Sequence, residues 1–293
     1  MSQRPTESVH SQSAGLHAAK GPVVLARLLD AQAAALQSVR AAIPSIEAAA
    51  TAAAGALRSG GKLAYAGAGS SGLMALADCL ELFGTFGIPP DRTPMLFAGG
   101  AGALLRMEGA VEDDPDLAMA DLKAAGLTAG DAVICLSASG RTPYTLVIAE
   151  AARRQGATVI GIANVAGSAL LEKADIAILL DTGPEMIAGS TRLGAATAQK
   201  VALNMMSVLL GIWLGHVHDG HMVNVVADNE KLRDRAGRIV SALSGQPMEA
   251  ALRALGLAGG SVKAAVLVAR GKSPDQAAAD LARTDGHLAP HLE

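Results

Sequence analysis

The sequence predicts an α/β protein: a three-layer αβα sandwich around a parallel five-stranded sheet, with N-terminal helices and a small C-terminal three-helix appendage. Short, wholly apolar segments alternate with helical patterns through the middle of the chain. This alternation is typical of a parallel sheet that helices cover on both faces. Apolar residues make up 51% of the 293 residues and aromatic residues only 2%. A core of Ala, Val, Leu and Ile favours close helix–sheet packing over an all-β sandwich.

The expected elements follow from the apolar spacing. Residues 1–20 form an irregular arm, and two helices divided near Pro44 occupy residues 22–58. Strands are expected near 62–66, 94–98, 131–136, 157–162 and 175–180. Helices are expected near 71–84, 102–107, 115–124, 143–155, 167–173, 190–215 and 222–243.

A change of composition at Ser244–Pro247 predicts a boundary late in the chain. Three short helical segments follow it, near 247–256, 260–269 and 274–284. We therefore expect three parts. Residues 1–58 form the arm and N-terminal helices, 59–245 a phosphate-ester-binding α/β domain with trailing long helices, and 246–293 the appendage.

Charge and cysteine content exclude several classes of function. The net charge of −3 gives no electrostatic reason to expect nucleic acid or an anionic membrane as a partner. The two cysteines form no disulfide framework, which favours a reducing, cytoplasmic compartment. The first twenty residues lack an apolar secretory signal. Because Asn204 and Ser207 interrupt the apolar run Val201–Leu214, we expect a buried helix there.

A glycine- and serine-rich turn, Gly67–Gly72, separates the first apolar strand from a helical pattern. Gly69 allows the backbone to approach a ligand, and Ser70 and Ser71 add hydroxyl donors to the free N–H groups of a helix N-terminus. The turn therefore predicts a phosphate site, with a ligand-free strand–helix connection as the alternative. No Lys-Ser or Lys-Thr pair completes a Walker A motif. A dinucleotide site is weaker because no strand-end acid follows about 20 residues later.

A second turn of this kind, Ser137–Thr142, follows another apolar strand. Ser137, Ser139 and Thr142 supply hydroxyls around Gly140, and Arg141 provides a guanidinium for a phosphate or carboxylate. Because parallel strands end at one edge of a sheet, both turns are expected in one phosphate-ester site. The alternative is a pair of helix-capping turns.

A third candidate segment, Ser190-Thr191-Arg192, leads into an apolar helix. Ser190 or Thr191 suits the N-cap, which would place Arg192 in the first turn. A cation there opposes the helix dipole. We therefore expect Arg192 to contact a ligand or another subunit, with a surface salt bridge as the alternative.

Three glutamates are candidates for proton transfer. Leu82 and Phe83 follow Glu81, so apolar surroundings are expected to raise its pKa toward that of a general acid. Glu108 and Glu112 would share one face of a short helix, but the residues alone favour a solvated acidic turn for this run.

The histidines His216, His218 and His221 form an HxHxxH cluster at the end of an apolar helix. No acid or cysteine completes a familiar metal-ligand spacing around them, and histidines are favourable at a helix C-terminus. We therefore expect no metal.

Together these motifs resemble those of the N-acetylmuramic acid 6-phosphate etherases, a family within the sugar-isomerase (SIS) domain superfamily. The matching residues span nearly the whole chain: Gly67–Gly72, Asp78 with Glu81, Ser137–Pro143, Gly183–Glu185, Gly189–Arg192, Ala198–Lys200, Asn204-Met205, Val225–Ala227 and Asn229–Leu232. Thr6-Glu7 with Ser13 is similar to the N-terminal signature of the family.

The resemblance implies an SIS-type sandwich with a ubiquitin-associated-like (UBA-like) appendage, and a homodimer with its site near the subunit interface. It implies lyase-type cleavage of the D-lactyl ether of N-acetylmuramic acid 6-phosphate by elimination and hydration, without a cofactor. The products are N-acetylglucosamine 6-phosphate and D-lactate, released during peptidoglycan recycling. Glu81 matches the acid that protonates lactate and activates water. Glu112, rather than Glu108, matches the base at C2, because the intervening length fits without a gap.

Two positions depart from the family pattern: Leu73 stands where Arg is usual, and Gly194 where Lys is usual. Each lost charge-assisted contact weakens binding of an anionic substrate by about 1.5–3 kcal/mol. The segment after Glu81 also differs, because Leu82–Thr85 stands where Cys-Pro-Pro-Thr is usual. These departures leave two alternatives open: an aldose–ketose isomerase of the same fold, and a phosphosugar-binding regulator without catalysis.

Overall fold

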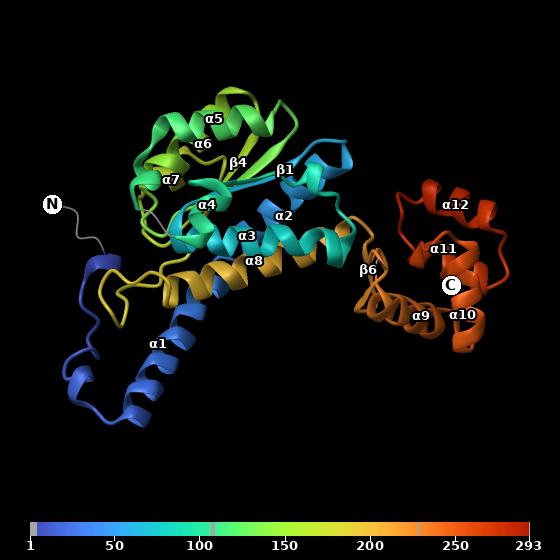
Figure 1. The fold of residues 1–293 in the computed structure, drawn as a ribbon, viewed down its shortest axis with the longest axis horizontal. Helices are drawn as coiled ribbons and strands as arrows, with labels where there is room; N and C mark the ends of the chain where they lie inside the picture. The colour runs from blue at the N-terminus through green and yellow to red at the C-terminus, as the bar shows by residue number, and fades with distance from the viewer. Residues whose placement is uncertain (1–4, 107–108, 228, 293) are drawn as a thin grey trace. The chain divides into compact units, whose positions relative to one another are not determined.

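The computed structural model describes residues 5–106, 109–227 and 229–292 (Figure 1). The chain divides into two compact units. The first comprises Met1–Cys79 and Asp91–Ser207, and the second comprises Leu80–Pro90 and Val208–Glu293. Two long helices, α3 (Gly69–Phe86) and α8 (Gly194–Trp213), have residues in both units.

The first unit contains one parallel sheet of five strands, as the sequence predicts. The strands are β1 (Leu63–Gly67), β2 (Met95–Phe97), β3 (Ala132–Leu136), β4 (Thr158–Ala163) and β5 (Ile176–Leu179). Their order is β2-β1-β3-β4-β5, so the chain changes direction across the sheet after β2. Gly67 pairs with Leu136 at the carboxyl ends of β1 and β3. The loops after these two strands therefore emerge side by side, at the switch point where ligands bind in such sheets.

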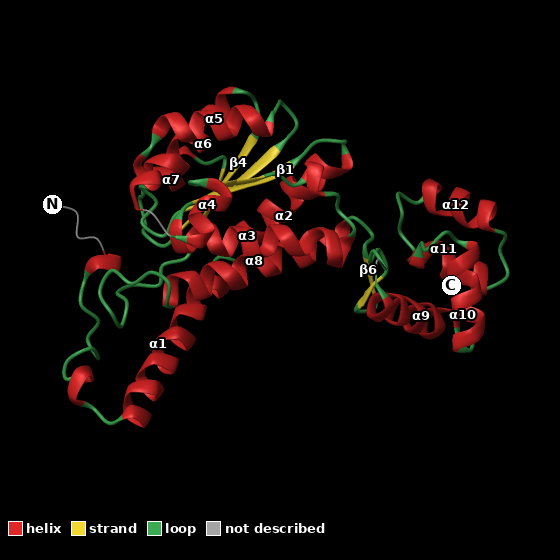
Figure 2. Cartoon of the chain, in the orientation of Figure 1, coloured by secondary structure: helices red, strands yellow, loops and turns green. Residues whose placement is uncertain are grey.

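Helices cover both faces of this sheet (Figure 2). The remaining helices of the first unit are α1 (Gly21–Ala41), α2 (Ile43–Arg58), α4 (Gly100–Leu105), α5 (Pro115–Ala125), α6 (Pro143–Arg154) and α7 (Ala169–Lys173). Pro44 lies at the start of α2, and Pro143 begins α6, as their positions in the sequence predict. The predicted strands and helices of this unit are confirmed to within a few residues, although residue 107 lies outside the described part of the chain.

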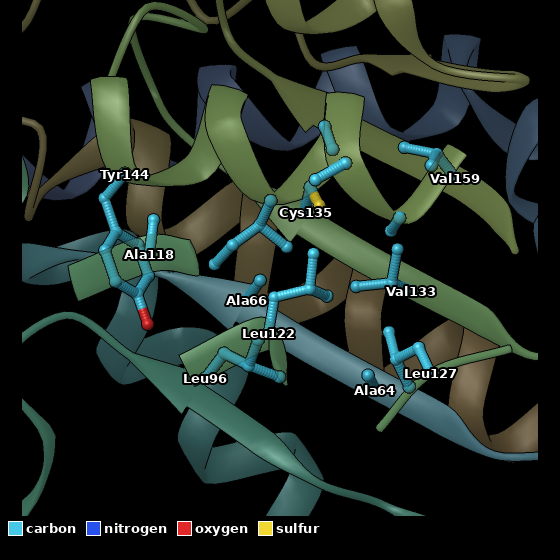
Figure 3. Close-up of a cluster of buried hydrophobic side chains, with 14 of the residues drawn as sticks. Ala64, Ala66, Leu96, Ala118, Leu122, Leu127, Val133, Cys135, Tyr144 and Val159 are labelled. Carbon is cyan, nitrogen blue, oxygen red and sulfur yellow. The ribbon is translucent and has the colours of Figure 1, made fainter. Parts of the chain in front are cut away.

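The core between the sheet and helices α5 and α6 consists of small and aliphatic side chains, as the composition predicts. Figure 3 shows Ala64, Ala66, Val133, Cys135 and Val159 of the sheet packed against Ala118, Leu122 and Tyr144 of the helices. The strands β1 and β3 are buried at all positions. The close packing of these strands therefore makes the sheet a rigid support for the loops that follow β1 and β3.

By length and composition, α8 alone among the described helices would suffice to cross a membrane unbent. In this structure 56% of its apolar window is buried inside the protein. The polar residues Asn204 and Ser207 donate hydrogen bonds to Asp78 of α3, at 2.8 and 2.9 Å. The helix therefore packs as the core helix that the interrupted apolar run predicts.

In the second unit, the sequence predicts a helix over 222–243, and this prediction is wrong at its N-terminal end. Residues 217–222 form a two-stranded antiparallel hairpin, β6 (Val217–His218) and β7 (His221–Met222), joined by Asp219-Gly220. Both turn residues have positive φ, 44° and 75°, as a two-residue hairpin turn of type I′ requires. Helix α9 (Glu230–Ser244) begins only after Asn229, whose side chain accepts a hydrogen bond from the N–H of Leu232.

The appendage helices are α10 (Met248–Leu257), α11 (Val262–Ala269) and α12 (Pro274–Arg283), as the sequence predicts. They share one apolar core with α9. Ser273 and Gln276 form a capping box at the start of α12. The contact between α9 and α10 is close, because a Cβ at Gly237 would lie 2.8 Å from the side chain of Leu252.

The second unit contains a partly buried basic cluster, His216, Lys263 and His287, whose titration is expected to limit stability in acid. The Nδ1 atom of His216 is buried without a hydrogen-bond partner among the described residues. Burial, Lys263 and His287 lower the pKa of His216 to about 4, from 6.5. The unfolded chain therefore binds more protons between pH 6.5 and 4, and the free energy of unfolding is expected to fall by about 2–3 kcal/mol as the pH drops through this range.

Urea unfolding at pH 7 and pH 5, followed by fluorescence of the single tryptophan Trp213, measures this loss. A His216→Gln variant should lose less stability on acidification than the wild type. Equal pH dependence in the two proteins would contradict the assignment to His216.

Candidate functional site

The first site loop is shorter than the sequence predicts, because α3 already begins at Gly69. Ser70 and Ser71 therefore lie in the first helical turn, where backbone N–H groups have no partner within the helix. Glycine is required at Gly67, since its Cβ would lie 3.0 Å from the Cα of Gly72. This close approach aims the N-terminus of α3, with its partial positive charge, at the edge of the sheet.

The second site loop, Ser137–Thr142, places three hydroxyl groups close together. The Oγ of Ser137 lies 2.8 Å from the Oγ1 of Thr142 and 3.4 Å from the Oγ of Ser139. The N–H of Arg141 donates to Ser139 Oγ at 3.2 Å, and the Arg141 side chain is exposed. Gly140 has φ +63° and sits against the side chain of the buried Ser168, so the loop has no room for a Cβ there.

The backbone of one residue, Ala138, bonds to the first loop and to the residue after β4. The N–H of Ala138 donates a hydrogen bond to Ser71 Oγ at 3.2 Å, and the carbonyl of Ala138 accepts one from the N–H of Asn164 at 2.9 Å. Ser71 and Ala138 are only 8% and 7% exposed. The structure therefore brings Gly69, Ser70 and Ser71 together with Ser137–Thr142.

Glu112 lies beside the first loop although it comes 43 positions after Gly69 in the sequence. A Cβ at Gly69 would lie 2.6 Å from Glu112 Oε1, so the carboxylate rests against the backbone of this glycine. Glu112 belongs to a 3-10 helix, Gly109–Asp113, in which Val111 packs on the core. Partial burial, and then Asp113, raise the pKa of Glu112. A carboxylate with a raised pKa is suited to proton transfer. Glu108 lies outside the described residues.

Glu81 is exposed on α3, contrary to the apolar surroundings that the sequence suggests. Leu82 beside it is buried, but its side chain points to another face of the helix, as expected for consecutive helical residues. Glu81 belongs to the second unit, whereas Gly69 and the two loops belong to the first.

The third segment, Ser190–Arg192, precedes α8 instead of beginning it, so neither Ser190 nor Thr191 is the N-cap. The reason is Glu185, which is 4% exposed. Its carboxylate accepts hydrogen bonds from the N–H groups of Gly194 and Ala195, both at 2.9 Å. Arg192 is exposed outside the first turn and does not oppose the helix dipole there.

The same contacts explain the space at Gly194. A Cβ at this position would lie 3.3 Å from Ala35 and 3.3 Å from Glu185 Oε2. The glycine therefore lets α1 and the capping carboxylate approach the start of α8.

Asn164 is a site-supporting residue that the sequence reasoning missed. It directly follows β4 and is fully buried. Its amide Nδ2 donates to the carbonyl of Leu180 at 3.0 Å and to Thr182 at 3.3 Å, and its Oδ1 accepts a hydrogen bond from Gln199 at 2.9 Å. Its position, as a polar residue directly after an apolar strand, could have indicated this role from the sequence.

The histidine cluster splits between different surroundings. His216 belongs to the partly buried basic cluster, whereas His218 and His221 face each other across the hairpin. Among residues 5–106, 109–227 and 229–292, no three His, Cys, Asp or Glu side chains gather in a way that could hold a metal ion.

The sheet order and the paired loops are those of a doubly wound α/β protein with a ligand site at its switch point. The sequence model of the SIS domain matches residues 28–164. The fold is also that of a phosphoheptose isomerase from Francisella tularensis, with a TM-score of 0.50 and 21% identity over 65% of this chain and 97% of that one.

The curated relatives are more specific. An N-acetylmuramic acid 6-phosphate etherase from Deinococcus radiodurans is 43% identical over 97% of this chain and 93% of its own. One from Mycolicibacterium smegmatis is 40% identical over 98% of this chain and 97% of its own. The chain therefore belongs to the N-acetylmuramic acid 6-phosphate etherase family, and the resemblance expected from its motifs is confirmed.

Proposed function

We propose that this protein is a carbon–oxygen lyase that cleaves the D-lactyl ether of N-acetylmuramic acid 6-phosphate. The observation that carries the proposal is the position of Glu112, whose partly buried carboxylate lies against Gly69 beside the two joined loops. The loops offer helix N–H groups and clustered hydroxyls to a phosphate, and Arg141 offers a positive charge. A base next to a phosphate site is what proton abstraction from a sugar phosphate requires.

In the proposed reaction, Glu112 removes the C2 proton of the open-chain sugar, which the C1 aldehyde acidifies. The electron pair forms the C2–C3 double bond, and the C3–O bond to lactate breaks. Glu81 protonates the departing oxygen. Glu81 then takes a proton from water as the water oxygen adds to C3, and Glu112 returns a proton to C2. The products are N-acetylglucosamine 6-phosphate and D-lactate, and no metal or nucleotide takes part. We place this reaction in the cytoplasm.

We further propose a homodimer in which two chains complete each site. Within one chain, Glu81 is exposed and belongs to the second unit, whereas Glu112 and the glycine that it touches belong to the first, so a second chain can supply the Glu81 of each site. The N-terminal half of α1 supports an interface, because it has no buried residue before Ala35 and exposes Val23, Leu25 and Leu29 by 44, 68 and 68%.

The activity is tested by incubating the purified protein with N-acetylmuramic acid 6-phosphate and assaying D-lactate. Lactate release well above that of a Glu81→Gln variant supports the proposal, and no difference between the two overturns it. Deuterium incorporation at C2 of a hexose phosphate without lactate release would instead indicate an isomerase. Tight binding without turnover would indicate a regulator.

The shared site is tested by mixing two variants. Glu81→Gln and Glu112→Gln homodimers should each be nearly inactive. After subunit exchange, about a quarter of the wild-type activity should return, since half of the dimers are mixed and each has one complete site. If differently tagged subunits copurify but activity does not return, each site lies within one chain.

The second loop gives a prediction for binding. Ser139→Ala and Arg141→Ala should each weaken binding of N-acetylglucosamine 6-phosphate by roughly 10- to 100-fold, because each removes a contact to an ionised group. Calorimetry measures this affinity. Arg154→Ala, at the exposed end of α6, is the control. Unchanged affinity in both loop variants would exclude this loop from the site.

A further inference from the structure

The segment Gly183–Arg192 contains no helix or strand. Its conformation therefore depends on its contacts with neighbouring parts of the chain. On its inner side, Glu185 holds it to the N-terminus of α8 through two hydrogen bonds of 2.9 Å. On its outer side lie residues 5–20, here named the N-terminal arm. Figure 1 shows the arm, in blue, beside this segment, in yellow.

Two hydrogen bonds join the N-terminal arm to the segment. The N–H of Gly189 donates to the carbonyl of Thr6 at 2.8 Å, and Ser13 Oγ donates to the carbonyl of Met186 at 2.8 Å. Thr6 is only 2% exposed although it lies near the start of the chain. The arm is therefore packed in place and not loosely attached.

Steric fit at Gly189 makes the contact specific. Gly189 has φ +76°, and a Cβ there would lie 2.9 Å from Glu7 Oε2. The glycine thus admits both the left-handed backbone conformation and the close approach of the arm. Arg27 of α1 supports the arm from its other side, by donating hydrogen bonds to the carbonyls of Gln12 and Ala14 at 3.3 and 3.4 Å.

From these contacts we infer that the N-terminal arm is a positioning element for substrate binding, with Ser13 as its principal side-chain anchor. Gly189 is followed immediately by Ser190, Thr191 and Arg192, so the arm fixes the residue that leads into this triplet. The inference rests on the proposed function and adds to it that Ser190, Thr191 and Arg192 contact the phosphosugar, as the expected ligand contact of Arg192 suggests. When the arm is released, fewer molecules hold the triplet in the binding conformation, and the apparent affinity falls by that fraction.

The main test compares Ser13→Ala, Ser13→Thr and Ser11→Ala in the full-length chain. Ser13→Ala removes the hydrogen bond to Met186, and KM for N-acetylmuramic acid 6-phosphate should rise by roughly 3- to 10-fold. The kcat should stay within about twofold, because no group that transfers protons changes. Ser13→Thr keeps the hydroxyl and should restore KM. Ser11 is exposed, and Ser11→Ala should match the wild type.

A second measurement uses the reciprocity of coupled binding. If the arm stabilises the binding conformation, bound N-acetylglucosamine 6-phosphate must slow hydrogen exchange at the Gly189 amide, which bonds to Thr6. This protection should be weaker in Ser13→Ala. A purely structural role would lower the melting temperature of Ser13→Ala without changing KM, and that result would overturn the inference.

The outcomes separate this inference from the proposed function. If the wild type releases no lactate but binds N-acetylglucosamine 6-phosphate, calorimetry with the same three variants still tests the arm. Equal affinity in the wild type and Ser13→Ala overturns the role of the arm alone. Absence of any sugar-phosphate binding by the wild type overturns both.

Discussion

Replacing Glu112 with Gln is expected to lower kcat for lactate release by about 10²- to 10⁴-fold, the usual contribution of a positioned general base. Glutamine has nearly the same shape, so it should still rest against Gly69, where Glu112 Oε1 lies 2.6 Å from the position of a Cβ. Only the ability to accept the C2 proton is lost. Binding of N-acetylglucosamine 6-phosphate should therefore change little, and steady-state kinetics with calorimetry separates the two effects.

The control is Glu47→Gln, at an exposed position of α2, which should leave kcat unchanged. Near-normal turnover in Glu112→Gln would show that another group removes the C2 proton.

The pH profile provides an independent test of the same residue. A base must be deprotonated to act, so kcat/KM should fall as the pH decreases through the pKa of Glu112 in the free enzyme. Burial and Asp113 raise that pKa above its ordinary value of 4.5, which places the acid limb above pH 4.5. Asp113→Asn removes the smaller of the two causes and should move the limb to lower pH. A limb that stays in place would assign it to a different group.

Replacing Asp78 with Ala is expected to lower the free energy of unfolding by about 3–5 kcal/mol. The Asp78 carboxylate is 4% exposed and accepts three hydrogen bonds: from the Tyr65 hydroxyl at 2.9 Å, from Asn204 at 2.8 Å and from Ser207 at 2.9 Å. Burial and then Asp78 raise the pKa of Tyr65 well above its usual range, so this phenol remains a donor. Alanine would leave buried donors unpaired, and each costs about 1–3 kcal/mol.

Urea unfolding measures the Asp78 effect, with Asp30→Ala at an exposed position of α1 as the control. Asp78→Asn keeps one acceptor oxygen and should lose less stability than Asp78→Ala. A loss under 1 kcal/mol in Asp78→Ala would mean that the network contributes little to the packing of α3 on β1 and α8.

The order of strands and helices could be predicted because the residues within each of these elements are enough to indicate its type. Leu63–Ala66 and Ala132–Leu136 are wholly apolar, and a buried parallel strand needs nothing else from its sequence. Pro44 and Pro143 mark helix starts in the same local way. The hairpin at Asp219-Gly220 also had a local signal, but apolar residues after it favoured a helix.

The features that could not be predicted depend on contacts distant in sequence. The start of α8 was misplaced because Glu185 caps it from outside the helix, and no local pattern announces such a cap. The proximity of Glu112 to Gly69 and of the N-terminal arm to Gly189 is likewise set by tertiary packing. For Glu81 the sequence neighbours were misleading. Its apolar neighbour Leu82 faces the core, whereas Glu81 itself faces solvent.

The two backbone hydrogen bonds of Ala138 lower the entropy cost of ligand binding. The Ala138 N–H bonds to Ser71 and the Ala138 carbonyl accepts a bond from the Asn164 N–H, so the two loops are already held before any ligand arrives. Little conformational entropy then remains to be lost at these loops on binding. Free and ligand-bound forms should superimpose closely there, so that any ordering that accompanies binding is confined to other parts of the site.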